Sequence, residues 1–134
     1  MAIWLLKTEP SVYSYDDLER DGSTMWDGVT NNTALQNIRK MVKGDTAIIY
    51  HTGDERAAVG IADVIKGYYV NPNFDDPKLA VCDVKAKKRL AKPVTLAQFK
   101  ALPELQNWDL VRLGRLSVVP VNDEQWKILL ELAK

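Results

Sequence analysis

Residues 46–65 read TAIIYHTGDERAAVGIADVI, in which two β-rich runs flank a short polar turn. The runs are Thr46–Thr52 and Ala57–Ile65, and Gly53-Asp54 between them is a turn signal at hairpin distance. Gly60 interrupts the second run, and a glycine inside a strand marks a bulge or a close approach of another segment. This stretch therefore predicts two paired strands in the middle of the chain.

Further strands are predicted on both sides of this pair. Residues Leu79–Leu90 alternate, with Cys82, Val84 and Ala86 on one face and charged side chains on the other. Short apolar runs predict two more strands, at 3–6 and 118–121. Capping signals precede four predicted helices: Ser14 before 15–20, Asn31 or Asn32 before a helix ending near Gly44, Thr95 before 96–102, and Asn122 before the last segment.

The predicted fold class is α+β: a small, curved, mostly antiparallel sheet or barrel with peripheral helices. The helices do not alternate regularly with the strands, which disfavours a doubly wound parallel sheet. A chain of 134 residues is about one domain long, so residues 1–134 are expected to form a single domain. Its core is expected to contain Trp4, Leu5, Ile48, Ile49, Val59, Ile61, Val84 and Leu129.

The composition is that of an ordinary globular protein. Hydrophobic residues make up 46% of the chain, and 18 basic side chains balance 18 acidic ones, which excludes wholesale disorder. No apolar run approaches the ~20 residues of a membrane span. The stretch Met1-Ala2-Ile3-Trp4 has no basic n-region and no cleavage site, so we expect no secretion by a signal peptide and a cytoplasmic protein, nuclear in a eukaryote. Neutral net charge argues against coating nucleic acid by charge alone, but it permits a local basic face or a base-sized pocket.

Motifs for catalysis and for cofactors are absent from the sequence. His51 is the only histidine and Cys82 the only cysteine, so an internal disulfide and a cysteine-based metal cluster are excluded. No P-loop, dinucleotide fingerprint, nucleophile elbow or zinc-protease motif is present. We therefore expect no cofactor, no metal and no enzyme activity. An enzyme that uses His51 or the carboxylate of Glu9 is the weaker hypothesis.

Two features of the sequence point to a binding site. Lys7-Thr8-Glu9-Pro10 is a polar cluster directly after an apolar strand, where side chains converge on a pocket, although a charged turn explains it equally well. Trp26 lies in a polar turn, and Tyr69 ends a strand before a loop. Aromatic rings in such places stack on nucleobases, which contributes about 1–3 kcal/mol per base. The alternative is that Trp26 packs in the core.

A basic stretch lies on the predicted strand 79–90. Alternation places Lys85, Lys87 and Arg89 on one solvent face, which is a candidate surface for nucleic-acid phosphates. A solvated strand edge that discourages aggregation is the other interpretation.

The chain resembles the EVE domain family, within the PUA-like fold group, over essentially its whole length. The resemblance rests on segments spread along the sequence: residues 4–10 with Tyr13-Ser14, 26–29 with Asn31, 43–45, 50–52, 59–62, 76–78, 92–96, and 115–118 with Pro120-Val121. Together these segments are specific to the family, although no single one is.

The resemblance implies a curved, barrel-like sheet with flanking helices and a non-enzymatic role. EVE domains are viewed as readers of modified bases in DNA or RNA, and are similar to YTH domains, which hold a methylated adenine in an aromatic cage. On that resemblance Trp26 is a cage wall, and Lys7, Thr8 and Glu9 line the same cavity. The expected ligand-binding set is completed by Asn31, Tyr69 and His51.

One segment departs from the family pattern. The usual run Arg-Asn-Tyr-Gln-Ala-Arg-Asn is replaced by TNNTALQ at residues 30–36, so Thr30 and Leu35 stand where the family has arginines. Asn31 remains, either to contact a base edge or to cap a helix. The missing arginines motivate an alternative function, a small-molecule or protein-interaction module on the same fold.

Overall fold

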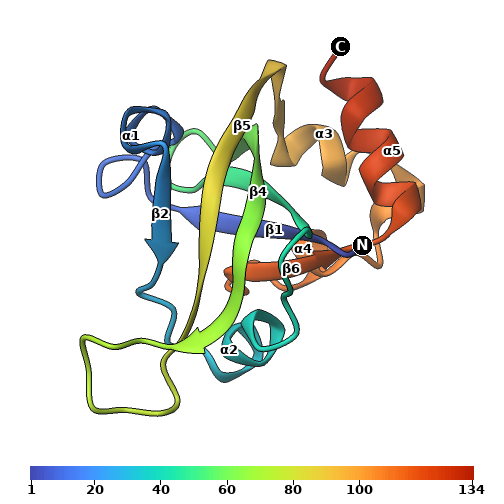
Figure 1. Ribbon diagram of the computed structural model, residues 1–134. Coiled ribbons are helices and arrows are strands. Elements are labelled where there is room, and N and C mark those ends of the chain that lie inside the picture. The colour runs from blue at the N-terminus through green and yellow to red at the C-terminus, as the bar shows by residue number, and fades with distance from the viewer.

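The computed structural model describes residues 1–134. Its elements are β1 (Ile3–Thr8), α1 (Tyr15–Asp21), β2 (Ser23–Trp26), α2 (Asn32–Ile38), β3 (Thr46–His51), β4 (Ala57–Val70), β5 (Ala80–Thr95), α3 (Leu96–Lys100), η1 (Pro103–Leu105), α4 (Asp109–Arg112), β6 (Val118–Val121) and α5 (Asp123–Leu132). The strands form one six-stranded sheet in the order β2-β5-β4-β3-β1-β6 (Figure 1). None of the helices combines the length and the apolar character needed to cross a bilayer.

The sheet is strongly curved and remains open. In Figure 1, β2, β4 and β5 run up and down the view, whereas β1 and β6 run across it. All neighbouring strands pair antiparallel except β1 with β3. The edge strands β2 and β6 do not pair with each other, so the sheet is not closed into a barrel. The predicted α+β class is thus confirmed, and closure of a barrel is not observed.

The core of the protein is one hydrophobic cluster to which strands and helices both contribute. A cluster of 36 buried residues contains all eight side chains that were predicted for the core. Trp108, which ends the turn before α4, is also buried and packs edge-on against Phe99.

The strand pair predicted for residues 46–65 is β3 with β4, and Ile48 lies opposite Ile61. The register of β4 with β5 shifts between Ala58 and Gly60, where the glycine predicted an irregularity. The same residue allows a close approach. A Cβ on Gly60 would lie 2.3 Å from the ring of Tyr15, whose hydroxyl donates a hydrogen bond of 2.7 Å to the carbonyl of Ile61.

Gly60→Ala is expected to destabilise the protein by about 1–3 kcal/mol or more, because the buried Tyr15 ring has no space to retreat. Urea denaturation, compared through the midpoint, measures the loss. Gly114→Ala is the matched control, because nothing lies within 4 Å of a Cβ built there. Equal midpoints for the two variants would contradict the close approach.

Several elements differ in extent from their predictions. β2 was not predicted, since its four residues form an edge strand that exists only through pairing with β5. β4 and β5 are longer than expected, because each continues as the partner of the other. α2 ends at Ile38 rather than near Gly44. The capping boxes of α1, α3 and α5 are present, and the last two place Gln98 and Gln125 at N3.

Candidate functional site

A cavity of about 420 Å³ opens where β1 and β2 end. Its lining combines polar and aromatic side chains from four segments: Lys7, Thr8, Glu9, Val12, Tyr13, Thr24, Met25, Trp26, Asp27, Gly28, Val29 and Ser117. Four of the predicted site residues, Lys7, Thr8, Glu9 and Trp26, are therefore brought together here. We refer to this space as the first cavity.

Trp26 is at once a core residue and a wall of the first cavity. It is the last residue of β2, pairs with Cys82 of β5, and is 6% exposed. Its ring lies edge-on to Tyr13, with centroids 6.3 Å apart and planes at 84°. Gly28, with φ at 78°, lets the chain turn sharply after the indole. The two sequence interpretations of Trp26 are thus compatible.

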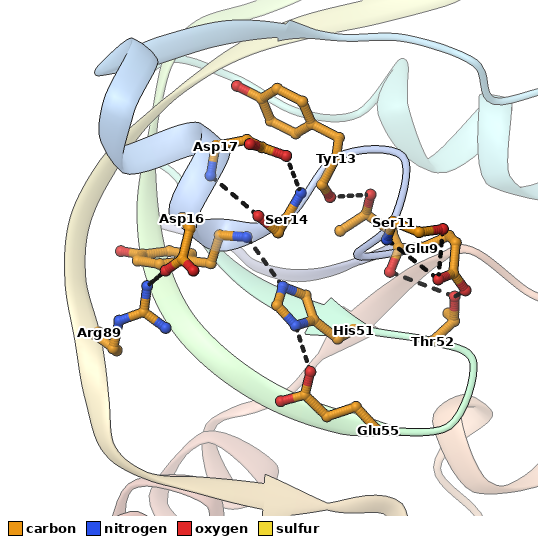
Figure 2. A network of polar contacts seen from close by, with 12 residues as sticks. Glu9, Ser11, Tyr13, Ser14, Asp16, Asp17, His51, Thr52, Glu55 and Arg89 are labelled. Atoms are coloured by element: carbon orange, nitrogen blue, oxygen red, sulfur yellow. Dashed lines mark hydrogen bonds and ion pairs between the residues drawn. The ribbon is translucent and has the colours of Figure 1, made fainter.

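The polar residues at the end of β1 hold the loop that closes one side of the first cavity. The Thr8 hydroxyl donates to the Tyr13 carbonyl at 2.7 Å, and the carboxylate of Glu9 accepts from Ser11 and, at 3.4 Å, from the Thr52 hydroxyl (Figure 2). Lys7 Nζ donates to the Gly114 carbonyl at 3.0 Å. Burial lowers the pKa of Lys7, because desolvation disfavours the charged ammonium.

His51, which was expected in the ligand-binding set, lies apart from the first cavity and is 6% exposed. Its Nε2 accepts a hydrogen bond of 3.0 Å from the backbone N–H of Tyr15, so the ring proton resides on Nδ1. Nδ1 then donates to Glu55 Oε1 at 2.7 Å (Figure 2). Both ring nitrogens are engaged within the fold, which makes His51 a structural residue that fixes the start of α1.

Asn31 and Tyr69 also lie outside the lining of the first cavity. Asn31 caps α2, since its Oδ1 accepts from the backbone N–H of Ala34 at 3.0 Å. The Tyr69 hydroxyl donates to Asp83 at 2.5 Å, and its ring lies under the Lys66 ammonium at 4.1 Å. Burial, together with Asp83, raises the pKa of Tyr69 to about 12. The polar groups of both residues therefore make hydrogen bonds within the protein.

Two of the three cations on the predicted phosphate-facing side of β5 pair with acidic side chains. Arg89 pairs with Asp16 and, at 2.6 Å, with Glu19 of α1, which lies about 70 positions earlier in the chain. Lys87 lies 3.8 Å from Asp63 of β4. Lys85 is exposed and makes no ion pair. Of the three cations predicted to face phosphates, only Lys85 is therefore without an ion pair.

The family arginines that are missing here fall at two different kinds of position. Thr30 is exposed, in the loop after the first cavity. Leu35 is 3% exposed and belongs to the core cluster, so the side chain at this position packs in the core instead of bringing a charge to the surface.

Sequence reasoning missed Tyr13, Thr24 and Ser117 of the cavity lining. Ser117 reaches the cavity because its carbonyl accepts a hydrogen bond of 2.9 Å from the backbone N–H of Lys7, 110 positions away in the sequence. No local pattern signals such a contact. No group of three or more His, Cys, Asp and Glu side chains is arranged to hold a metal ion.

The open α+β sheet carries an aromatic-walled cavity at the ends of its strands β1 and β2. Residues 2–132 match the family model of the EVE domain, and the chain belongs to that family. Thymocyte nuclear protein 1 from Homo sapiens is 28% identical over 96% of this chain and 72% of the relative.

Solved structures of similar proteins have the same fold. Rpa0253 from Rhodopseudomonas palustris superposes with a TM-score of 0.93 at 40% identity, covering 99% of this chain and 93% of the other. The human THYN1 protein in complex with DNA containing 5-methylcytosine superposes with a TM-score of 0.91 at 27% identity, covering 100% of this chain and 98% of the other. The resemblance stated from the sequence is thereby confirmed at the level of family and fold.

Proposed function

We propose that this protein is a non-enzymatic module that binds DNA carrying a modified base and holds that base in the first cavity. The observation that carries the proposal is the human relative, which superposes over the whole chain and is seen with 5-methylcytosine DNA. The chemistry of the first cavity supports it, because an indole wall, a lysine and two carboxylates surround a space of about 420 Å³.

Each group of the first cavity has a role that suits a nucleobase. The Trp26 ring offers a flat face for stacking, and its indole N–H, which makes no hydrogen bond within the protein, remains free to donate. Glu9 and Asp27 offer acceptors for an exocyclic amine such as that of cytosine. Lys7 offers a donor to a ring or carbonyl acceptor. A base reaches this cavity only when it leaves the stack, so unpaired and single-stranded sites are favoured.

Binding rather than catalysis is supported by the state of His51. A triad would have to pass through this histidine. Glu55 stands where a triad has its orienting carboxylate, but Nε2, which would have to accept a proton from a nucleophile, already accepts the backbone N–H of Tyr15.

The proposal is tested by titrating the protein with oligonucleotides that differ only in one base. Single-stranded and duplex DNA with cytosine or 5-methylcytosine, and the matching RNA, are compared by fluorescence anisotropy. Burial of one methyl group contributes about 0.8 kcal/mol, so we expect about fourfold tighter binding of the methylated strand. Equal affinity for both bases would exclude 5-methylcytosine as the recognised base, and binding of RNA alone would exclude DNA as the partner.

A second candidate is a module that has retained the cavity for a small molecule and lost nucleic acid. Leu35, which packs in the core where the family has an arginine, favours it. Binding of free nucleosides without any gain in affinity for oligonucleotides would support this candidate.

A further inference from the structure

A second cavity, of about 300 Å³, adjoins the first and shares the Lys7 side chain with it. It lies between the end of β3, the turn that follows, and the segment around Gly114, and its lining is Lys7, Tyr50, Thr52, Gly53, Arg56, Leu96, Leu110 and Gly114. The only charged side chains in this lining are the two cations, Lys7 and Arg56.

Tyr50 presents an unused hydroxyl to the second cavity. The residue is 3% exposed, and its hydroxyl makes no hydrogen bond within the protein. Since no side-chain oxygen or nitrogen is both fully buried and unpaired, this hydroxyl reaches the cavity surface. Burial raises the pKa of Tyr50, which keeps the hydroxyl protonated as a donor. A donor in a mostly enclosed position without a protein partner is suited to a ligand.

Arg56 contributes a positive charge to the lining of the second cavity. Its Nε donates to the Gly53 carbonyl at 3.1 Å, which orients the guanidinium and leaves its terminal amino groups without a protein partner. Its positive charge acts on the Tyr50 hydroxyl and opposes the effect of burial on that pKa. Arg56 is also the one residue other than glycine with a positive φ, 46°. This uncommon backbone conformation costs free energy, and such outliers concentrate at functional sites.

Lys7 completes the cationic lining. Its ammonium lies 5.7 Å from the centroid of the Tyr50 ring, and no carboxylate is within ion-pair distance of it. The Glu9 carboxylate is not part of this lining but lies next to it, since it accepts a hydrogen bond from Thr52 and is close to Gly53. Glu55 accepts from His51. Two cations and a hydroxyl donor therefore converge without a compensating negative charge in the lining.

We propose that the second cavity binds a phosphate group, held by the Arg56 fork, the Lys7 ammonium and the Tyr50 hydroxyl. A planar guanidinium matches phosphate oxygens, and lysine adds a point charge. The inference rests on the proposed function when the phosphate is a phosphodiester of bound DNA. The two cavities share the Lys7 side chain, so we expect a nucleotide with its base in the first cavity to place its backbone near the second. A small molecule with a free phosphate is the other source of the same chemistry.

The test compares Arg56→Asn and Tyr50→Phe with the wild type, using a single-stranded 5-methylcytosine oligonucleotide over a range of salt concentrations. Asparagine tolerates the positive φ of residue 56, and phenylalanine keeps the Tyr50 ring, so both variants are designed to fold. Lys127→Gln removes the same charge as Arg56→Asn from the exposed face of α5 and serves as the matched control.

Arg56→Asn is expected to weaken binding about tenfold and to make the slope of log affinity against log salt shallower by about 0.7. Tyr50→Phe is expected to weaken binding about threefold to tenfold with an unchanged slope, because it removes a neutral donor. The ratio of affinities for methylated and unmethylated strands stays the same in both variants, since the first cavity is intact. Lys127→Gln binds as the wild type does.

If Arg56→Asn binds with the affinity and the salt slope of the wild type, the phosphate site is excluded. The proposed function would then still be supported by a preference for the methylated strand. If the wild type binds no oligonucleotide, the proposed function fails, and inorganic phosphate decides the inference. Movement of the Arg56 side-chain Nε–H signal in NMR spectra on addition of phosphate, absent or weakened in Tyr50→Phe, would support a free phosphate ligand. If this signal does not move when phosphate is added to the wild type, the phosphate site is excluded.

Discussion

Replacing Trp26 with alanine is expected to weaken binding of a 5-methylcytosine oligonucleotide about 5- to 150-fold, since a ring stacked on a base contributes roughly 1–3 kcal/mol. For a ligand of modest affinity this loss abolishes detectable binding. Trp26→Phe is expected to retain part of the affinity, because a smaller aromatic face remains. Fluorescence anisotropy on both variants, with circular dichroism to measure the folded fraction, checks these results.

Trp26 also belongs to the core, so its truncation affects stability as well. Loss of a buried indole costs about 3–5 kcal/mol. Trp108→Ala is the matched control: this indole is equally buried, donates to the Pro120 carbonyl at 3.1 Å, and lies outside the first cavity. We expect folded Trp108→Ala to bind as the wild type does. If folded Trp26→Ala binds with the affinity of the wild type, the first cavity is not the site that holds the base.

Asp45→Ala is expected to lower the free energy of unfolding by roughly 3–5 kcal/mol, because it leaves three donors without their acceptor, one of them buried and two part-buried. Asp45 is 1% exposed. Its Oδ1 accepts from the backbone N–H of Ala2 at 3.1 Å, and its Oδ2 accepts from the Trp4 indole at 3.0 Å and from the backbone N–H of Val42 at 3.1 Å. One carboxylate thus joins the start of β1 to the turn before β3.

Urea denaturation measures the loss as a shift of the midpoint at constant m. Asp54→Ala is the matched control, because Asp54 is exposed and its side chain makes no hydrogen bond, so a change within about 0.5 kcal/mol is expected. Trp4→Phe removes a single donor and should lose less than Asp45→Ala. A midpoint for Asp45→Ala equal to that of the Asp54 control would mean that the three hydrogen bonds contribute nothing net.

Local features of this chain were readable from its sequence because their partners lie within a few residues. Ser14 and Asp17, or Asn122 and Gln125, satisfy the first N–H groups of a helix from three positions away, so the capping boxes of α1 and α5 needed no knowledge of the fold. Gly60 signalled an irregular strand for the same reason, since a missing Cβ is a property of one residue. The family resemblance added the expectation that Trp26 and Lys7–Glu9 share a cavity.

The roles of individual polar groups depended on contacts that sequence spacing does not encode. The ring of His51 is committed by the Tyr15 N–H, 36 positions away, and the charge of Arg89 is taken up by Asp16, 73 positions away. β2 exists only as the partner of β5, and Ser117 and Lys7 meet only because β6 pairs with β1. Hydrogen bonds and ion pairs form only between atoms a few ångströms apart, so the packing of the strands decided which of the chain's cations have an acidic partner.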